Sequence, residues 1–337
     1  MRSNAFAILA DVILLALIVV GAVWLFVSGM SPGAWTSDRP LLPLSVEGAQ
    51  VTLLVAAVGI ILGLVLAWLL PRARDRVVNG DVVRYRLYER LVHWALALGY
   101  VLAFVTGAWL LRWLSVQTNR DILPSLYLVH YIGAALIVFA AGAFVTSARV
   151  RGEDALFPRW RDVSPAVARL FSYLGIYGQP GVLSLRWPRS WQEPWQRFLA
   201  ELGIRPAKAE GKFLSVEKVL SFAPLAILTF IVVGTGLVKA VRYFFQVPGD
   251  VYYWATWLHD LSAWFTLVVV GVHIVAIFLV PRNWPGIRAM ISGRISQHVV
   301  EEEFPAWAES LRSPDGQAAE AEGAAAPGAK AVKPGGI

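Results

Sequence analysis

Cysteine is absent from this sequence of 337 residues. Its absence excludes disulfide bonds, thiolate zinc sites, iron–sulfur clusters bound by the chain itself, thioether-linked c-type haem and a thiol nucleophile. Charged residues are also scarce, because they make up 16% of the chain whereas soluble domains carry about 25%. Hydrophobic residues make up 57%, and this composition argues against an ordinary soluble globular protein.

Long apolar runs are the main feature of the chain. Six uncharged stretches reach or approach the roughly 20 residues that a membrane-spanning helix needs. They are residues 12–27, 48–71, 91–111, 122–148, 219–238 and 261–281. The first run, with Arg2 before it, also resembles a secretory signal, but it is long for a signal and no clear cleavage site follows it. We therefore predict an all-α integral membrane protein with six transmembrane helices, the first of them an uncleaved anchor.

The basic residues are unevenly distributed among the segments that connect these runs. Of the 30 Lys and Arg residues, 25 lie before the first run, between the second and third, between the fourth and fifth, or after the sixth. The segments 28–47, 112–121 and 239–254 hold the other five. Since basic residues are enriched on the cytoplasmic side, we predict that both chain ends are cytoplasmic and that these three segments lie outside. The net charge of +7 is then a sign of membrane orientation, and we expect no nucleic-acid partner.

The runs divide the chain into three parts. Residues 1–71 form two N-terminal transmembrane helices, residues 72–312 hold four further helices, and residues 313–337, rich in Ala, Gly and Pro, form a disordered tail. A long cytoplasmic connection, residues 149–212, lies within the central part. Its stretch 187–195 is expected in the membrane interface, where tryptophan is favoured. No periodic repeat is evident.

Four of the five histidines lie in or beside the apolar runs: His93, His130, His259 and His273. An ionisable side chain within a membrane indicates a functional site. In the predicted orientation, His130 and His259 lie near the outer face and His93 lies near the inner face. His273 follows His259 by 14 residues, which is about 21 Å along a helix and within roughly 40° of the same direction. His273 is therefore expected on the same helix face, but deeper.

Depth sorts these residues into an outer pair, His130 with His259, and an inner pair, His93 with His273. Two imidazoles from facing helices are the ligand set of one b-type haem, so the pattern predicts two haem b groups in a four-helix bundle. The three methionines all lie outside the runs, so we do not expect methionine ligation. The alternative is a haem-free anchor or transporter that uses the histidines as helix–helix hydrogen-bond partners or proton relays. His298, in the polar C-terminal region, is expected at the surface.

Five short motifs contain or follow these histidines. They are ERLVHW at 89–94, LVH at 128–130, WLH at 257–259, GVH at 271–273 and GIRAMISG at 286–293. In these motifs the chain resembles the gamma subunit of membrane-bound formate dehydrogenase, a dihaem cytochrome b family that also resembles nickel–iron hydrogenase cytochrome b subunits. The similarity covers residues 83–311. The resemblance implies that the four histidines are the axial haem ligands, in the two pairs just described.

The resemblance also implies partners and an electron acceptor. An iron–sulfur beta subunit and a molybdopterin or tungstopterin catalytic subunit would dock on the outer side of the bacterial inner membrane. A quinone, either ubiquinone or menaquinone, would be reduced near the inner haem, where Lys212, Glu217 and Lys218 lie at the matching depth. Glu217 is expected to relay protons and Lys218 to stabilise the reduced oxygen, although all three also fit the alternative of interface anchors. Leu214 stands where many members of that family carry an amide, which weakens the quinone assignment.

The expected function is electron transfer within an oxidoreductase complex and not catalysis of formate oxidation, because the chain has no site for a catalytic cofactor. Electrons would enter close to the outer pair, around residues 121–127 and 249–260. Asp260 is a candidate docking residue there, or alternatively a capping residue at a helix start. Another alternative keeps the haems and changes the partner to a hydrogenase, thiosulfate reductase or another molybdoenzyme.

Overall fold

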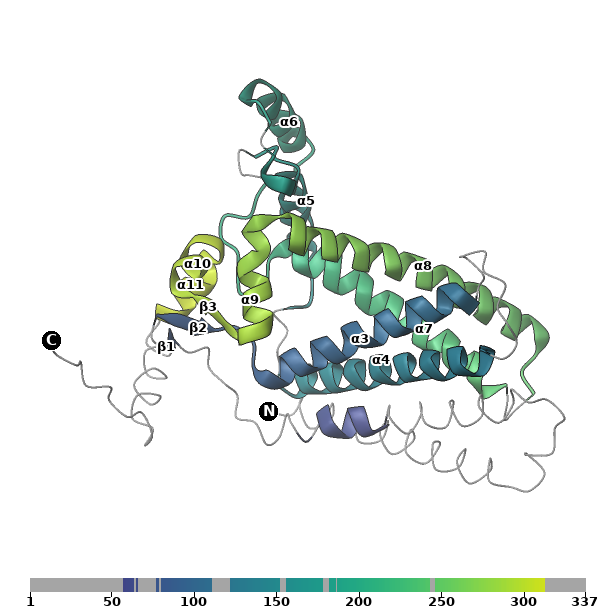
Figure 1. Ribbon diagram of the computed structural model, residues 1–337. Helices are drawn as coiled ribbons and strands as arrows, with labels where there is room; N and C mark the ends of the chain where they lie inside the picture. The colour runs from purple at the N-terminus through teal and green to yellow at the C-terminus, as the bar shows by residue number, and fades with distance from the viewer. Residues whose placement is uncertain are drawn as a thin grey trace, which may run out of the picture. The chain divides into compact units, whose positions relative to one another are not determined.

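The structure is a computed structural model, and it describes residues 57–63, 65, 77–78, 80–110, 122–151, 156–177, 182–185, 187–242 and 246–312. Four long helices dominate this part of the chain (Figure 1): α3 (Leu87–Leu110), α4 (Leu123–Arg151), α7 (Ala223–Val241) and α8 (Gly249–Leu279). The chain divides into two compact units. The helical unit contains these four helices up to His273 of α8, and the mixed unit contains the strands and the remaining helices.

Four segments are long and apolar enough to cross a membrane: Leu87–Leu110, Ser125–Val145, Glu217–Val241 and Gly249–Leu279. They correspond to the last four predicted runs, and they confirm a mostly helical, multi-pass membrane protein. The predicted spans 12–27 and 48–71 lie outside the described residues, apart from helical residues at 57–63 and 65. The predicted tail, residues 313–337, also lies outside them.

The start of α8 differs from the prediction. The helix begins at Gly249, whereas the apolar run begins at Leu261. Its first three turns contain tyrosine, tryptophan and acidic residues, which interrupt the apolar run but suit a helix end at the membrane interface. Asp250 in the first turn also favours a helix start, since a negative charge there complements the helix dipole. Asp260 therefore lies well inside α8, and the interpretation of Asp260 as a capping residue is wrong.

Close packing joins α3 to α4 in the helical unit. A Cβ added at Gly133 of α4 would lie only 2.8 Å from the backbone oxygen of Gly99 and from the backbone nitrogen of Ala103, both in α3. Small residues of this kind let membrane helices approach with their backbones nearly in contact. A small core of Val92, Ala140 and Ala143 lies along the same pair of helices. The glycines thus allow α3 and α4 to pack directly against each other.

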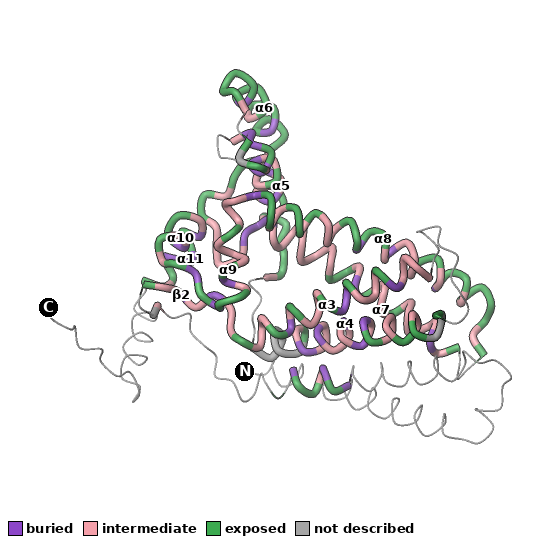
Figure 2. The backbone as a smooth tube through the Cα atoms, in the orientation of Figure 1, coloured by how far each residue is buried: buried purple, intermediate pink, exposed green. Residues whose placement is uncertain are grey.

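The outer surfaces of the four helices are apolar and exposed. Few residues along them are fully buried (Figure 2), and large side chains such as Phe230, Ile227 and Leu91 are 80%, 61% and 60% exposed. Monomeric soluble proteins rarely expose apolar patches of this extent. In a bilayer these side chains contact lipid, so the exposure agrees with the membrane-spanning lengths of the helices.

The mixed unit contains a small antiparallel sheet that the all-α prediction missed. Strands β1 (Val77–Val78), β2 (Asp81–Val83) and β3 (Arg294–Ser296) follow one another in that order across the sheet. Val82 pairs with Ile295, and both side chains are buried. Strands of two or three residues are too short to show an alternating pattern, so the prediction failed here.

Short helices make up most of what the structure describes in the rest of the mixed unit. They are α5 (Trp160–Tyr173), α6 (Arg189–Glu201), α9 (Trp284–Ser292), α10 (Gln297–Glu303) and α11 (Pro305–Arg312), with 3-10 turns η2 (Val182–Ser184) and η4 (Pro281–Asn283). The connection predicted at 149–212 thus contains two helices, α5 and α6. Gly293 ends α9 with φ of +85°, a conformation that glycine adopts without strain. Its carbonyl accepts hydrogen bonds from the backbone nitrogens of Arg84 and Tyr85, at 2.9 and 3.1 Å, which ties β2 to the end of α9.

An ion cluster around Glu303 holds α5, η4 and α10 together. The carboxylate accepts a 2.6 Å hydrogen bond from Arg169 and another from Arg282. Burial by itself raises the pKa of Glu303, but the hydrogen bonds from the two arginines, with their charges, outweigh this effect and hold the pKa below its ordinary value. The ionised carboxylate is therefore the form that stabilises the mixed unit.

Replacing Glu303 by glutamine should lower the free energy of unfolding by about 3 kcal/mol at neutral pH, because two nearly buried guanidinium groups lose their counter-charge. Since the folded pKa lies below the unfolded value of about 4.3, the contribution of Glu303 is complete above that value and is lost as the pH falls through the folded pKa. The measurement is denaturant unfolding of the full chain in detergent between neutral and acidic pH. The stability difference from wild type should shrink at the acidic end.

A matched control removes the neighbouring charge. Glu302 has a side chain that is 68% exposed and its partner in α10 is His298 at 3.9 Å. Glu302→Gln should therefore change stability by no more than about 0.5 kcal/mol. Equal effects of the two substitutions would show that the cluster does not stabilise the unit.

Candidate functional site

The helical unit contains all four predicted ligands. His93 lies in α3, His130 in α4, and His259 and His273 lie in α8. The fifth histidine, His298, lies in α10 with its side chain 85% exposed, as expected for a surface residue. The structure thus gathers the four membrane histidines on three of the four long helices.

His130 and His259 face each other across α4 and α8. Their ring centroids lie 6.4 Å apart, with the ring planes at 67°. Two imidazoles that bind one metal from opposite sides, each through a nitrogen about 2 Å from it, have ring centres roughly 6 Å apart. The separation of these two rings therefore matches a single metal held between them.

Hydrogen bonds to Nδ1 determine which ring nitrogen of His259 is free. Nδ1 lies 3.0 Å from the backbone oxygen of Val232 and 3.2 Å from the hydroxyl of Thr235, both in α7. A carbonyl oxygen only accepts, so the hydrogen-bond network assigns the ring proton to Nδ1. Nε2 then carries the lone pair, which is the form of imidazole that binds a metal.

His130 has the same arrangement with α3. Its Nδ1 lies 3.0 Å from the hydroxyl of Thr106, and that hydroxyl donates a 2.6 Å hydrogen bond to the backbone oxygen of Leu102. Since the threonine proton is used in this bond, the threonine oxygen accepts from the ring. Nε2 of His130 is therefore also the nitrogen with the lone pair, and a partner on the second nitrogen orients a metal-ligating histidine.

The two environments are copies of one local pattern, which the sequence analysis missed. Thr106 precedes His130 by 24 residues, and Thr235 precedes His259 by the same number. A glycine follows each threonine, and a Cβ there would lie 3.6 Å from the His130 ring at Gly107 and 3.2 Å from the His259 ring at Gly236. The signal in the sequence was a Thr-Gly dipeptide that stands 24 residues before His130 and again 24 residues before His259.

The predicted inner pair consists of His93 in α3 and His273 in α8, both in the helical unit. Nδ1 of His273 lies 3.3 Å from the hydroxyl of Ser221. Nδ1 of His93 is buried and has no hydrogen-bond partner among the described residues. The other three membrane histidines each have a partner at Nδ1, so His93 lacks the contact that fixes the ring proton on Nδ1.

These observations test whether the site fits haem. The donor set is two pairs of imidazoles on apolar helices, and one pair has the spacing and the tautomer that iron requires. Within the described residues, no cluster of three or more His, Cys, Asp or Glu side chains is arranged to hold a metal ion. Pairs of axial ligands, with the remaining metal bonds made by a porphyrin, are what this chain offers. The residues present fit haem b.

The three predicted quinone residues make contacts within the mixed unit. Glu217, the first residue of the π-helical turn η3 (Glu217–Phe222), accepts hydrogen bonds from the Leu214 backbone at 2.9 Å and from Arg84 at 3.4 Å. Lys218 lies 3.9 Å from the carboxylate of Asp162, and the Lys212 ammonium lies over the Trp307 ring at 5.6 Å. These contacts join the three residues to other parts of the mixed unit, and they leave the quinone assignment and its alternative, anchoring at the membrane interface, as predictions.

Arg84 is the buried centre of this cluster, and sequence reasoning did not single it out. Its side chain also donates to the Lys212 carbonyl at 3.2 Å and lies over the Phe304 ring at 4.4 Å. Burial lowers the pKa of the guanidinium, but its interactions with Tyr85 and Glu217 outweigh burial and leave the pKa above its ordinary value. Arg84 therefore remains charged and holds Glu217 as its counter-ion.

Asp260 forms an ion pair with Lys239 of α7 at 3.9 Å, and both side chains are 30% exposed.

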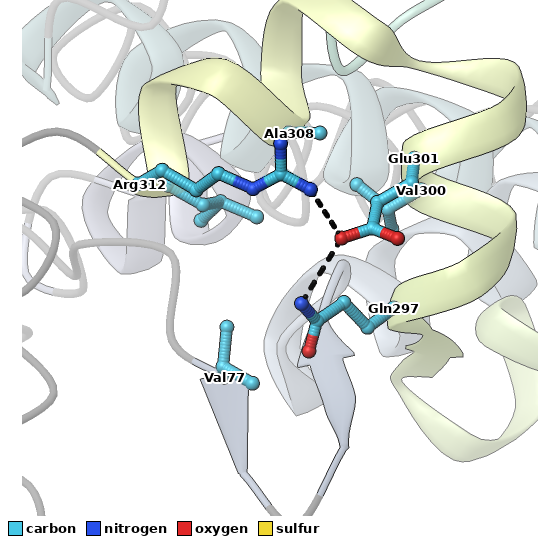
Figure 3. Close-up of a pocket in the computed structure, with 7 residues that line it drawn as sticks. Val77, Gln297, Val300, Glu301, Ala308 and Arg312 are labelled. Atoms are coloured by element: carbon cyan, nitrogen blue, oxygen red, sulfur yellow. Dashed lines mark hydrogen bonds and ion pairs between the residues drawn. The ribbon is translucent and has the colours of Figure 1, made fainter.

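A cavity of about 140 Å³ in the mixed unit (Figure 3) is lined by residues of β1, α10 and α11, with Glu301 bonded to Arg312 and Gln297. None of the predicted site residues lines that cavity, so it has no part in the site.

The comparison with known families matches the region that holds the site. The family described as prokaryotic cytochrome b561 matches residues 84–293, which is more than half of the chain. The match contains α3, α4, α7 and α8 with all four histidines. Among curated proteins, none matches the chain. The chain therefore belongs to the prokaryotic cytochrome b561 family, and it is a multi-pass membrane cytochrome b that binds haem b and transfers electrons.

Proposed function

We propose that this cytochrome is the membrane-anchoring subunit of a periplasmic formate dehydrogenase complex, and that it passes electrons through two haem b groups to a quinone. The observation that carries the electron path is the His130–His259 pair, with rings 6.4 Å apart and both Nδ1 atoms bound to α3 or α7. The motifs around the four histidines support the formate dehydrogenase partnership.

In this proposal His130 and His259 hold the outer haem, and His93 and His273 hold the inner one. When bound, the haem groups would supply one-electron chemistry between the ferric and ferrous states. Thr106 and Thr235 keep the protons of the outer ligands on Nδ1, so that Nε2 stays available. The apolar side chains of the four helices keep water away from the path.

The donor side follows from the charge distribution. Segments 28–47, 112–121 and 239–254 hold five of the 30 basic residues and are assigned to the periplasm. An iron–sulfur subunit, itself bound to the molybdopterin or tungstopterin subunit, would contact residues near 121–127 and the first turns of α8. Asp260 is already paired with Lys239, so docking at Asp260 would have to exchange or share that ion pair.

The acceptor side is assigned to the cytoplasmic face, in the bacterial inner membrane. Glu217 and Lys218 lie at the start of the segment that crosses the membrane as Glu217–Val241, and a quinone that takes two electrons also needs two protons. Glu217→Gln and Lys218→Ala should slow quinone reduction while leaving both haems reducible by the donor. Normal quinol formation in both variants would assign these residues to anchoring alone and move the quinone site elsewhere.

The formate dehydrogenase partner has a close alternative, because a hydrogenase or another molybdoenzyme would use the same haems. The experiment is purification of the tagged chain from its own membranes in mild detergent, identification of the co-purifying subunits, and addition of formate or of hydrogen. The proposal expects a molybdopterin or tungstopterin subunit and haem reduction by formate. Reduction by hydrogen alone would assign the chain to a hydrogenase. A preparation without haem would favour the anchor or transporter alternative.

A further inference from the structure

Helix α6 exposes an apolar face that the proposed electron path does not use. Trp191, Trp195, Phe198 and Leu202, the last just after the helix end, recur at the spacing of one helix face. Their exposed fractions are 63%, 42%, 49% and 59%. We call these four residues the tryptophan stripe. Apolar residues on one helix face normally turn toward a protein core, so a stripe of this kind on the outside calls for a covering partner.

A neighbouring face of α6 is fixed to the rest of the mixed unit. Leu199 is 1% exposed, and Gln192 is buried with its side-chain amide donating to the Trp187 carbonyl at 2.5 Å. Gln196 donates to the Ile176 carbonyl at 2.8 Å. These contacts fix the orientation of the helix and leave the tryptophan stripe exposed.

The charges in and around α6 are mainly positive. Between residues 186 and 208 the chain has five basic and two acidic residues. Arg189 and Arg197 of α6 are exposed, and so are Arg205 and Lys208 just beyond it. A basic helix with tryptophan and phenylalanine on one face is typical of helices that lie in the headgroup region of a membrane, where anionic lipids attract the basic side chains.

Helix α6 stays near a membrane surface because the chain enters a membrane-spanning helix both before and after it. The helix lies in the connection between the spans Ser125–Val145 and Glu217–Val241, so both ends of that connection leave the membrane at the same face. Tryptophan is enriched at this depth because its ring is apolar and its N–H is polar. A lipid surface is thus within reach of the tryptophan stripe and complements both its apolar character and its charge.

We propose that α6 is an interfacial helix whose tryptophan stripe inserts into the headgroup region of the bilayer, with the neighbouring arginines contacting anionic lipid headgroups. The inference concerns a lipid-binding surface and does not depend on the identity of the electron donor. It assigns a role to part of the long connection, which the four membrane-spanning helices do not require.

The chain has no cysteine, so single cysteines carry a nitroxide spin label without background. The full chain with Phe198→Cys is labelled in nanodiscs of phosphatidylcholine, with and without phosphatidylglycerol. Glu193→Cys, an exposed position off the stripe, is the matched control. Collision of the label with oxygen, which concentrates in lipid, is compared with collision with a water-soluble nickel chelate.

The proposal expects the label at 198 to collide more often with oxygen than with the chelate, and more strongly so when phosphatidylglycerol is present. The label at 193 should show the reverse order. Frequent chelate collisions at 198 would place the stripe in water and overturn the proposal. Protection of 198 from both reagents would mean that a second copy or another protein covers the stripe, and would overturn it as well.

Discussion

The His259→Ala variant should retain one haem b and lose the other. The reason is that His130 and His259 face each other at 6.4 Å and would share one iron, whereas His93 and His273 are proposed to hold the other. His130→Ala should give the same result. The double variant should lose no more haem than either single variant, because both substitutions empty one site. Pyridine haemochromogen analysis of the purified protein measures the haem content.

The matched control is His298→Ala, since this histidine is exposed on α10 and should leave both haems in place. Loss of both haems from the single variants at normal protein yield would show that the two sites are not independent. Retention of both haems in the double variant would exclude His130 and His259 as ligands.

The second large effect is expected from the threonines that bind the outer ligands. Thr106→Val and Thr235→Val keep the side-chain shape but remove the hydroxyl that accepts from Nδ1. Loss of such a partner typically lowers metal affinity roughly 10–100-fold. About tenfold is expected for Thr235→Val, because the Val232 carbonyl still holds the His259 ring, and an effect within the same range is expected for Thr106→Val. The measurement is the rate at which each haem is lost to an excess of apomyoglobin.

Serine at the same positions restores the hydroxyl, so Thr106→Ser and Thr235→Ser should bring haem retention back toward wild type. Thr256 is the matched control, because its hydroxyl bonds only to the Tyr252 carbonyl of its own helix, at 2.9 Å, among the bonds described. Thr256→Val should leave haem loss unchanged. Equal haem loss from all three valine variants would mean that the threonines affect the helices and not the histidines.

The long helices could be predicted from the sequence because membrane spans are recognised by their length and apolar composition. α3, α4, α7 and α8 were all expected, and only the start of α8 was misplaced, since aromatic and acidic residues interrupt its apolar run. The small sheet was missed, although Asn79-Gly80 between two Val-Val pairs is a hairpin signal. The prediction did not use this turn signal, and strands of two or three residues are too short to show a periodic pattern by themselves.

The sequence identified the candidate ligands of the site but not the residues that contact them. The four histidines stand out because ionisable residues are rare in apolar runs. The threonines that orient them do not stand out, since threonine is ordinary in a membrane helix and only the repeated spacing connects Thr106 and Thr235 with a ligand. Contacts such as Arg84 with Glu217 join residues 133 positions apart, which local patterns do not reveal.

The most direct test of the account is the haem content and the reduced-minus-oxidised spectrum of the purified, unmodified protein. We expect two haem b per chain with the low-spin spectrum of bis-histidine ligation, because the four histidines on α3, α4 and α8 would supply two pairs of axial ligands. A single haem per chain, a methionine-ligated spectrum, or a folded protein without haem would contradict it.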